Sequence, residues 1–174
     1  MNVENEIYYH VHRVQQDNQW KVGNVFSFDQ NKYNKFFEYY NQNVLVSTGE
    51  YQYQELYKIM NEYAMLIREL VYEEIRLKKY PDYPSRQHCI WLCNKENLGT
   101  WLNALKEGQL EIYKVRVTGK IHKCYGGALE NTNINYKLLC EKAEEYWSGK
   151  CVGDPEAKEY LLEGKVEVIE KIVI

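Results

Sequence analysis

The strongest constraint on this chain is a long stretch of helical periodicity in its first half. From about Gln54 to Lys79, apolar residues recur at spacings of three and four, which is the pattern of an amphipathic helix and corresponds to roughly 39 Å at 1.5 Å per residue. These residues are Leu56, Ile59, Met60, Tyr63, Ile67, Leu70, Val71 and Ile75. The other face carries Glu62, Arg68, Glu69, Glu73 and Arg76. Pro81 and Pro84 end the helix, because proline cannot continue the hydrogen-bond ladder.

Alternation of apolar and polar residues predicts strands on both sides of this helix. The expected strands cover 7–14, 86–93, 111–117, 159–162 and 165–174, with a short extended piece at 25–28. Thr118-Gly119 is expected to break the middle strand, and Gly164 indicates a bulge between the last two. Shorter helices are expected at about 31–41, 95–105 and 136–147. This order is typical of an α+β domain with mainly antiparallel sheets, and we expect one domain over residues 1–174.

Length and composition narrow the class of protein. A chain of 174 residues with 45% hydrophobic residues forms a core without disulfides or metals. The 17 tyrosines suit half-wet surfaces and clefts, since tyrosine keeps a polar tip. The net charge of −3, with no block of Lys and Arg, disfavours bulk binding to nucleic acid. There is no apolar run of about 18 residues and no signal-peptide pattern at the N-terminus, so we expect no membrane span and a cytoplasmic protein.

Several common site motifs do not occur in the sequence. There is no GxGxxG, GxxxxGK[ST], HExxH or GxSxG, which argues against a Rossmann cofactor site, a P-loop, a zincin metal site and a nucleophile elbow. The five cysteines, Cys89, Cys93, Cys124, Cys140 and Cys151, contain no CxxC pair. We therefore expect reduced thiols and no metal.

Three short segments gather residues that can carry chemistry. On a strand, Tyr8, His10 and His12 share one face. The segment Ser85–Leu92 leads from polar residues into an apolar strand. Glu159 opens a second apolar segment near the end of the chain.

These segments resemble motifs of the histidine-class ADP-ribosyltransferases. Tyr9-His10 resembles their histidine motif, and Ile90-Trp91-Leu92, followed by Leu98 and Trp101, resembles their strand-then-helix segment. Glu111 to Gly119 resembles their middle strand, and Glu159-Tyr160-Leu161-Leu162 resembles the late strand that begins with the catalytic glutamate. The order and spacing are similar to the small bacterial members, including the rifamycin-modifying type. Over nearly its whole length, the chain is also similar to an uncharacterised bacterial domain family associated with this superfamily.

The resemblance implies an ADP-ribosyltransferase-like fold, with NAD as the substrate. Such enzymes break the bond between nicotinamide and ribose, and a carboxylate near the 2′-hydroxyl stabilises the charge that develops on the ribose. Glu159 is the implied catalytic carboxylate, and Glu163 is the alternative, because the sequence alone defines the register of the last strands only to within a few residues. His10 would anchor a ribose or the nicotinamide edge.

The same resemblance implies a set of cofactor-binding residues. Trp91 or Tyr113 would stack on nicotinamide, and Ser85 would hydrogen-bond the ribose. Arg86 would pair with a pyrophosphate oxygen, and Arg13 is a further expected contact.

Each of these residues also has a structural interpretation. His10 can be a hydrogen-bonded strand histidine, Trp91 a core residue, and Arg86 a partner of Glu69 on the long helix.

The first functional hypothesis is an NAD-dependent mono-ADP-ribosyltransferase or NAD glycohydrolase, acting as a toxin, effector or phage-conflict factor on a protein or nucleic-acid acceptor. The alternative is a non-catalytic module of the same fold that binds a nucleotide or a protein.

Overall fold

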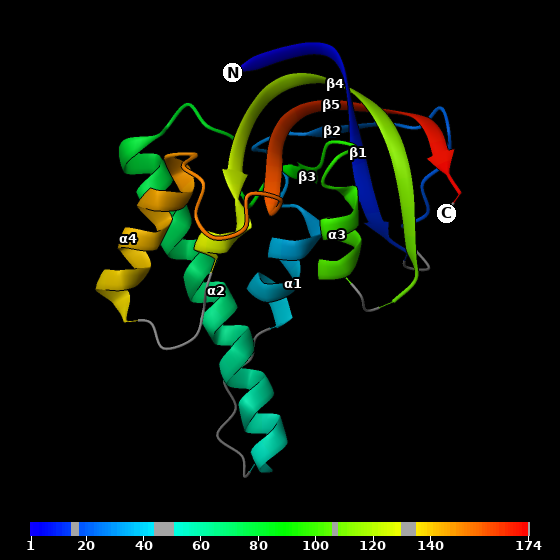
Figure 1. Ribbon diagram of the computed structural model, residues 1–174. Coiled ribbons are helices and arrows are strands. Elements are labelled where there is room, and N and C mark those ends of the chain that lie inside the picture. The colour runs from blue at the N-terminus through cyan, green and yellow to red at the C-terminus, as the bar shows by residue number, and fades with distance from the viewer. Residues whose placement is uncertain (15–17, 44–50, 106–107, 130–134, 174) are drawn as a thin grey trace.

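A computed structural model of the protein describes residues 1–14, 18–43, 51–105, 108–129 and 135–173 (Figure 1). Strands and helices follow one another along the chain in the order expected of an α+β domain. The elements are β1 (Asn2–Arg13), β2 (Val25–Phe28), α1 (Lys35–Asn43), α2 (Tyr53–Lys79), β3 (Ile90–Leu92), α3 (Leu98–Ala104), β4 (Leu110–Tyr125), a 3-10 turn η1 (Gly126–Ala128), α4 (Tyr136–Trp147) and β5 (Lys158–Ile172). No helix in the described part of the chain has the length and apolar character needed to span a membrane.

Every strand pairing in the sheet is antiparallel. The strands follow the order β1-β4-β5-β2, and β3 pairs with β5. Tyr9 of β1 exchanges two backbone hydrogen bonds of 2.9 and 2.8 Å with Cys93, directly after β3. β1, β4, β5 and β3 therefore close on themselves, and Figure 1 shows how strongly β4 and β5 curve to allow it. The α+β class with an antiparallel sheet is confirmed.

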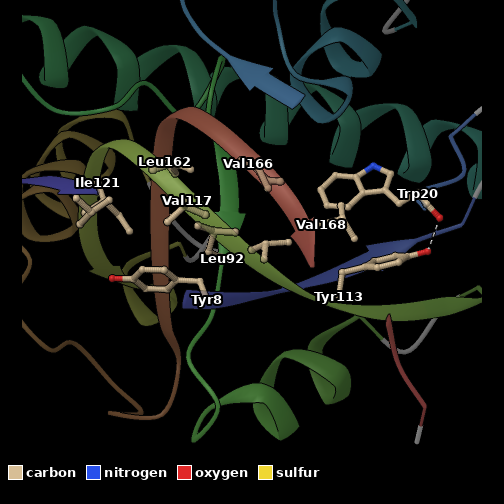
Figure 2. Packing of buried hydrophobic residues seen from close by; sticks show 12 residues of the cluster. Tyr8, Trp20, Leu92, Tyr113, Val117, Ile121, Leu162, Val166 and Val168 are labelled. Atoms are coloured by element: carbon tan, nitrogen blue, oxygen red, sulfur yellow. Dashed lines mark hydrogen bonds between the residues drawn. The ribbon is translucent and has the colours of Figure 1, made fainter. Parts of the chain in front are cut away.

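The inner face of the curved sheet encloses an apolar cluster that draws on every strand (Figure 2). Trp20, in the segment between β1 and β2, lies over one end of it and stacks on Phe26 at 4.5 Å between ring centroids. The hydroxyl of Tyr113 lies 2.9 Å from the Trp20 carbonyl oxygen, which ties this segment to β4. Alternation along a strand sends Leu162 into this cluster and Leu161 to the outer face.

The outer face of β3 and β5 packs against α2 and α4. A second cluster joins α2 and α4 to the strands, with Tyr72, Tyr146, Trp147 and Leu161 fully buried. The indole nitrogen of Trp147 donates a 2.8 Å hydrogen bond to the carbonyl of Tyr72. This bond joins the middle of α2 to the end of α4, so that α2 and α4 are held together on one side of the sheet (Figure 1).

The long helix α2 buries its charged face and exposes much of its apolar stripe. Arg68, Glu69 and Arg76 are buried, together with the apolar side chains of Val71, Tyr72 and Ile75. Leu56, Met60, Ile67 and Leu70 are exposed. An amphipathic helix of a globular protein ordinarily turns its apolar stripe to the core. Here the orientation is set by the polar contacts of Arg68, Glu69 and Arg76.

Two expectations about the effect of glycine on the strands are wrong. Thr118-Gly119 does not end a strand, since β4 continues to Tyr125, and residues 159–174 do not form two strands with a bulge at Gly164. Gly119 pairs directly with Gly164 in continuous register, and both have positive φ, at 153° and 151°. The two backbones approach so closely that a Cβ atom on either glycine would lie 2.3 Å from a carbonyl oxygen of the other strand. The glycines bend a long pair of strands instead of interrupting it.

This contact predicts that Gly119→Ala lowers the free energy of unfolding by about 2–4 kcal/mol, because the side chain meets backbone at a positive φ. Urea unfolding followed by tryptophan fluorescence measures the change. Gly99→Ala in α3 is the matched control: a Cβ there meets nothing within 4 Å, so the change should stay below about 1 kcal/mol. Equal losses for the two variants would contradict the role given to this contact.

Candidate functional site

Arg86 is the centre of a buried polar network on the helix-facing side of the sheet. Its guanidinium is 3% exposed and donates to both carboxylate oxygens of Glu69, at 2.9 and 3.2 Å. It also donates to Oε1 of Glu159 at 2.9 Å and to the hydroxyl of Tyr146. The Tyr146 ring lies 4.9 Å from the guanidinium carbon. The pairing of Arg86 with Glu69, one of the two interpretations of the sequence, is confirmed.

A short turn before β3 places Arg86 in this position. Residues 86–88, which were expected to start a strand, instead turn through hydrogen bonds from the backbone N–H groups of His88 and Cys89 to the Ser85 carbonyl, at 3.2 and 2.9 Å. The side chain of Asn34 stabilises the turn, because its amide donates hydrogen bonds to the carbonyl oxygens of Arg86 and Cys89 at 2.7 and 3.0 Å. The turn therefore aims Arg86 at α2 and α4.

Glu69 lies between two guanidinium groups. Arg68 donates to Glu69 Oε1 through Nε and Nη2, at 3.1 and 2.9 Å, while Arg86 approaches from the other side. Burial alone would raise the pKa of Glu69, but the charges and hydrogen bonds of Arg86 and Arg68 outweigh it and leave the pKa lowered. Burial of two guanidinium groups is tolerated because Glu69, together with Glu159 on Arg86, balances their charge.

Glu159, the expected catalytic acid, is anchored through only one of its oxygens. Oε1 accepts hydrogen bonds from Arg86 and from the hydroxyl of Tyr146, whereas Oε2 accepts none from the described residues. Among those residues, no buried side-chain oxygen lacks a hydrogen-bond partner. Oε2 therefore contacts solvent, although the residue as a whole is 7% exposed.

Trp91, one of the two aromatic residues expected to stack on nicotinamide, lies beside this network. Its half-buried ring lies 5.5 Å from the guanidinium carbon of Arg86 and packs edge-on against Phe36 at 5.5 Å. The structure thus brings together Arg86, Trp91 and Glu159 from two distant parts of the sequence. Tyr146 and Asn34 belong to the same site but were not identified from the sequence, because neither lies in a motif.

His10 and Tyr113, two other expected site residues, face the opposite side of the sheet. The His10 ring stacks on Trp20 at 4.6 Å, and its Nδ1 lies 2.9 Å from the Trp91 carbonyl oxygen. A carbonyl only accepts, so Nδ1 carries the hydrogen. Burial lowers the pKa of His10 to about 4, so the ring is neutral at pH 7. Tyr113 is fully buried in the inner cluster and has no face available to a ligand.

The remaining expected residues, Ser85 and Arg13, do not join the network around Arg86. The Ser85 hydroxyl donates to Glu73 at 2.9 Å, and its backbone N–H donates to Glu163 at 2.6 Å. Glu163, the competing acid, is therefore engaged with the start of the turn. Arg13 is exposed at the end of β1.

The cysteine thiols near the network are not activated. Burial raises the pKa of Cys93 to about 12 and also raises the pKa values of Cys89 and Cys124. A thiolate is the nucleophilic form, so these residues are structural. No three His, Cys, Asp or Glu side chains of the described segments are grouped as a metal site.

Two surface hollows lie at the bend of β4 and β5. The larger, of about 450 Å³, is lined by Asn2, Val3, Glu4, Thr118, Gly119 and Lys120, and the smaller is about 220 Å³. Arg86, Trp91 and Glu159 line neither of them. A ligand at the buried network would therefore use a different part of the surface.

We expect Glu69→Gln to lower the free energy of unfolding by about 3–5 kcal/mol, because the change leaves two buried guanidinium groups without their shared carboxylate. Chemical unfolding of the purified protein provides the value. Glu167→Gln, which breaks the exposed Arg116–Glu167 pair at 2.9 Å, is the control and should cost at most about 1 kcal/mol. A small loss for Glu69→Gln would show that the network does not hold the fold.

A pH dependence follows from His10. Between pH 6.5 and about 4 the unfolded chain takes up a proton on this residue and the folded chain does not, so stability falls as the pH falls through this range. In His10→Gln, the slope of unfolding free energy against pH should be shallower by up to about 1.4 kcal/mol per pH unit. Part of the slope should remain in His10→Gln, because burial also lowers the pKa of His122 to about 4. An unchanged slope would contradict the neutral, buried state of His10.

Comparison with known proteins identifies the family of this chain but no activity. The model of a family described as a protein of unknown function, DUF2441, matches residues 8–173. A search among curated proteins finds no match. The matched range takes in every residue of the polar network, and the chain belongs to the DUF2441 family.

Proposed function

We propose that this protein cleaves the nicotinamide–ribose bond of NAD at Glu159 and transfers ADP-ribose to an acceptor or to water. The proposal rests on the way in which the two carboxylate oxygens of Glu159 are held. One oxygen is fixed by Arg86 and Tyr146, and the other contacts solvent. A carboxylate held in this way can present a lone pair to a ribose hydroxyl without reorganising.

The chemistry needs a fixed negative charge close to the ribose. As the bond to nicotinamide breaks, the electron pair leaves with nicotinamide and positive charge develops on the ribose. Oε2 of Glu159 would accept a hydrogen bond from the 2′-hydroxyl and so stabilise that charge. The half-buried Trp91 ring would supply a stacking surface for nicotinamide.

The contacts of Arg86 favour a positioning role in place of the expected pyrophosphate contact. Its donors are used by Glu69, Glu159 and Tyr146. His10 lies on the opposite face of the sheet, so the proposal assigns it no part in the reaction at Glu159. The acceptor we propose is a protein or nucleic acid inside the cell, which fits an effector or a phage-conflict factor.

The test is release of nicotinamide from NAD by the purified protein. Glu159→Gln should reduce the rate by about 100-fold or more, because the amide cannot supply the charge, while NAD binding measured by calorimetry persists. Glu163→Gln is the matched control and should retain activity, since Glu163 is engaged with the Ser85 backbone. Loss of activity in Glu163→Gln with full activity in Glu159→Gln would reverse the assignment.

One observation favours a second candidate, a non-catalytic binding module. Within the fold, Glu69 and Glu159 balance the charges of Arg68 and Arg86, as in a purely structural network. The module would show no nicotinamide release with NAD alone or with added acceptors, in the wild type and in every variant. NAD binding without turnover would indicate a nucleotide-binding module, and absence of both would indicate a protein-binding one.

A further inference from the structure

The exposed face of α2 carries a regular apolar seam. Steps of three and four residues alternate without a break along it, which is the a and d spacing of a coiled coil. The seam consists of Tyr53, Leu56, Met60, Tyr63, Ile67, Leu70, Glu74 and Leu77. Seven of the eight positions are apolar or aromatic, and the helix presents them over about 36 Å at 1.5 Å per residue.

Most of this seam is turned away from the rest of the protein, although Glu74 lies next to Tyr136 at the start of α4. Val71, Tyr72 and Ile75 of the same helix are buried in the cluster with α4, whereas six seam residues are exposed and the other two, Tyr63 and Glu74, are half-buried. The exposed fractions are 82% for Tyr53, 46% for Leu56, 62% for Met60, 48% for Ile67 and Leu70, and 58% for Leu77. Figure 1 shows the N-terminal half of α2 projecting beyond the sheet and the other helices. A partner helix therefore has access to it.

We infer that the seam is a dimer interface, on which α2 of a second copy of this chain packs in the antiparallel direction. A register that places Tyr53 against Leu77 of the other copy uses the whole seam. In this register Met60 lies against Leu70, and Tyr63 faces Ile67. Each tyrosine meets an aliphatic side chain, so the seam is complementary to itself.

The single charged seam residue decides between the two directions of packing. In a parallel dimer in register, Glu74 would face Glu74 of the other copy across the axis, and two like charges in contact destabilise an interface. In the antiparallel dimer, Glu74 lies near one end of the seam and faces Leu56. There it keeps its ion pair with Lys78, whose side chain is 63% exposed. The antiparallel direction also opposes the two helix dipoles favourably.

The apolar area is large enough for a specific dimer. If a large side chain offers roughly 200 Å², the exposed fractions of the six most exposed seam residues correspond to about 600–700 Å² on each chain. Two chains together would bury at most about 1,300 Å², which reaches the lower end of the range for specific protein interfaces. A patch of this size is also larger than most monomers expose.

Paired charge substitutions test both the interface and its direction. Analytical ultracentrifugation should detect a dimer of the wild type at about 10–100 µM. Met60→Glu and Leu70→Lys should each raise the dimer dissociation constant by about tenfold or more. The double variant Met60→Glu/Leu70→Lys should dimerise again, because antiparallel packing brings the new carboxylate of each copy against the new ammonium group of the other.

A control variant and a test of folding accompany the measurements of dimerisation. Val22→Glu, at a position 60% exposed in a turn far from α2, should leave the dimer unchanged, and circular dichroism should show that every variant is folded. A wild type that is monomeric throughout, or a dimer that Met60→Glu leaves intact, would overturn the interface. Failure of the double variant to dimerise would overturn the antiparallel register, since a parallel dimer would place like charges together at both positions.

Discussion

The bidentate pair between Arg86 and Glu69 is the interaction on which the rest of the structure depends. It links the turn before β3 to the middle of α2, and Arg86 extends the link to α4 through Tyr146 and to β5 through Glu159. Four elements thus meet at one guanidinium group that is 3% exposed. A buried ion pair contributes little net stability compared with a well-packed apolar contact, but its directionality fixes how the groups are arranged. Here it fixes the rotation of α2 about its own axis.

That rotation explains why α2 exposes its apolar stripe. The residues that face inward include Arg68, Glu69 and Arg76, and each is satisfied within the protein; Arg76, for example, pairs with Glu73 and donates to the Pro81 carbonyl at 3.0 Å. Turning the apolar stripe inward would expose this network and leave its inward-facing partners on the turn and on β5 unsatisfied, at a cost that exceeds the gain from burying a few aliphatic groups.

Local signals in the sequence predict the elements well, and long-range contacts decide the rest. The bounds of α4 and β2 are as expected, because each is a short periodic run between turn residues. The break expected at Gly119 is absent, because glycine permits a close approach to Gly164 that no local pattern reveals. Arg86, Trp91 and Glu159 lie close together in the structure, whereas His10 does not join them. Strand alternation puts His10 on the inner face, and only the pairing of β1 with β4 reveals which face that is.

The two faces of α2 differ in their chemistry and in what they can contact. The inner face is polar, and its hydrogen bonds are directional, so it fixes a single orientation and register of the helix. The apolar contacts of Tyr72 and Ile75 alone would define that orientation less sharply. The outer face is apolar and follows a heptad, so it is complementary to a second helix and not to the curved sheet behind it. The inner face holds the C-terminal half of α2 in place, so this part of the seam is preorganised and loses little conformational freedom on association. A buried charge network thus stabilises an apolar surface that the fold itself does not cover.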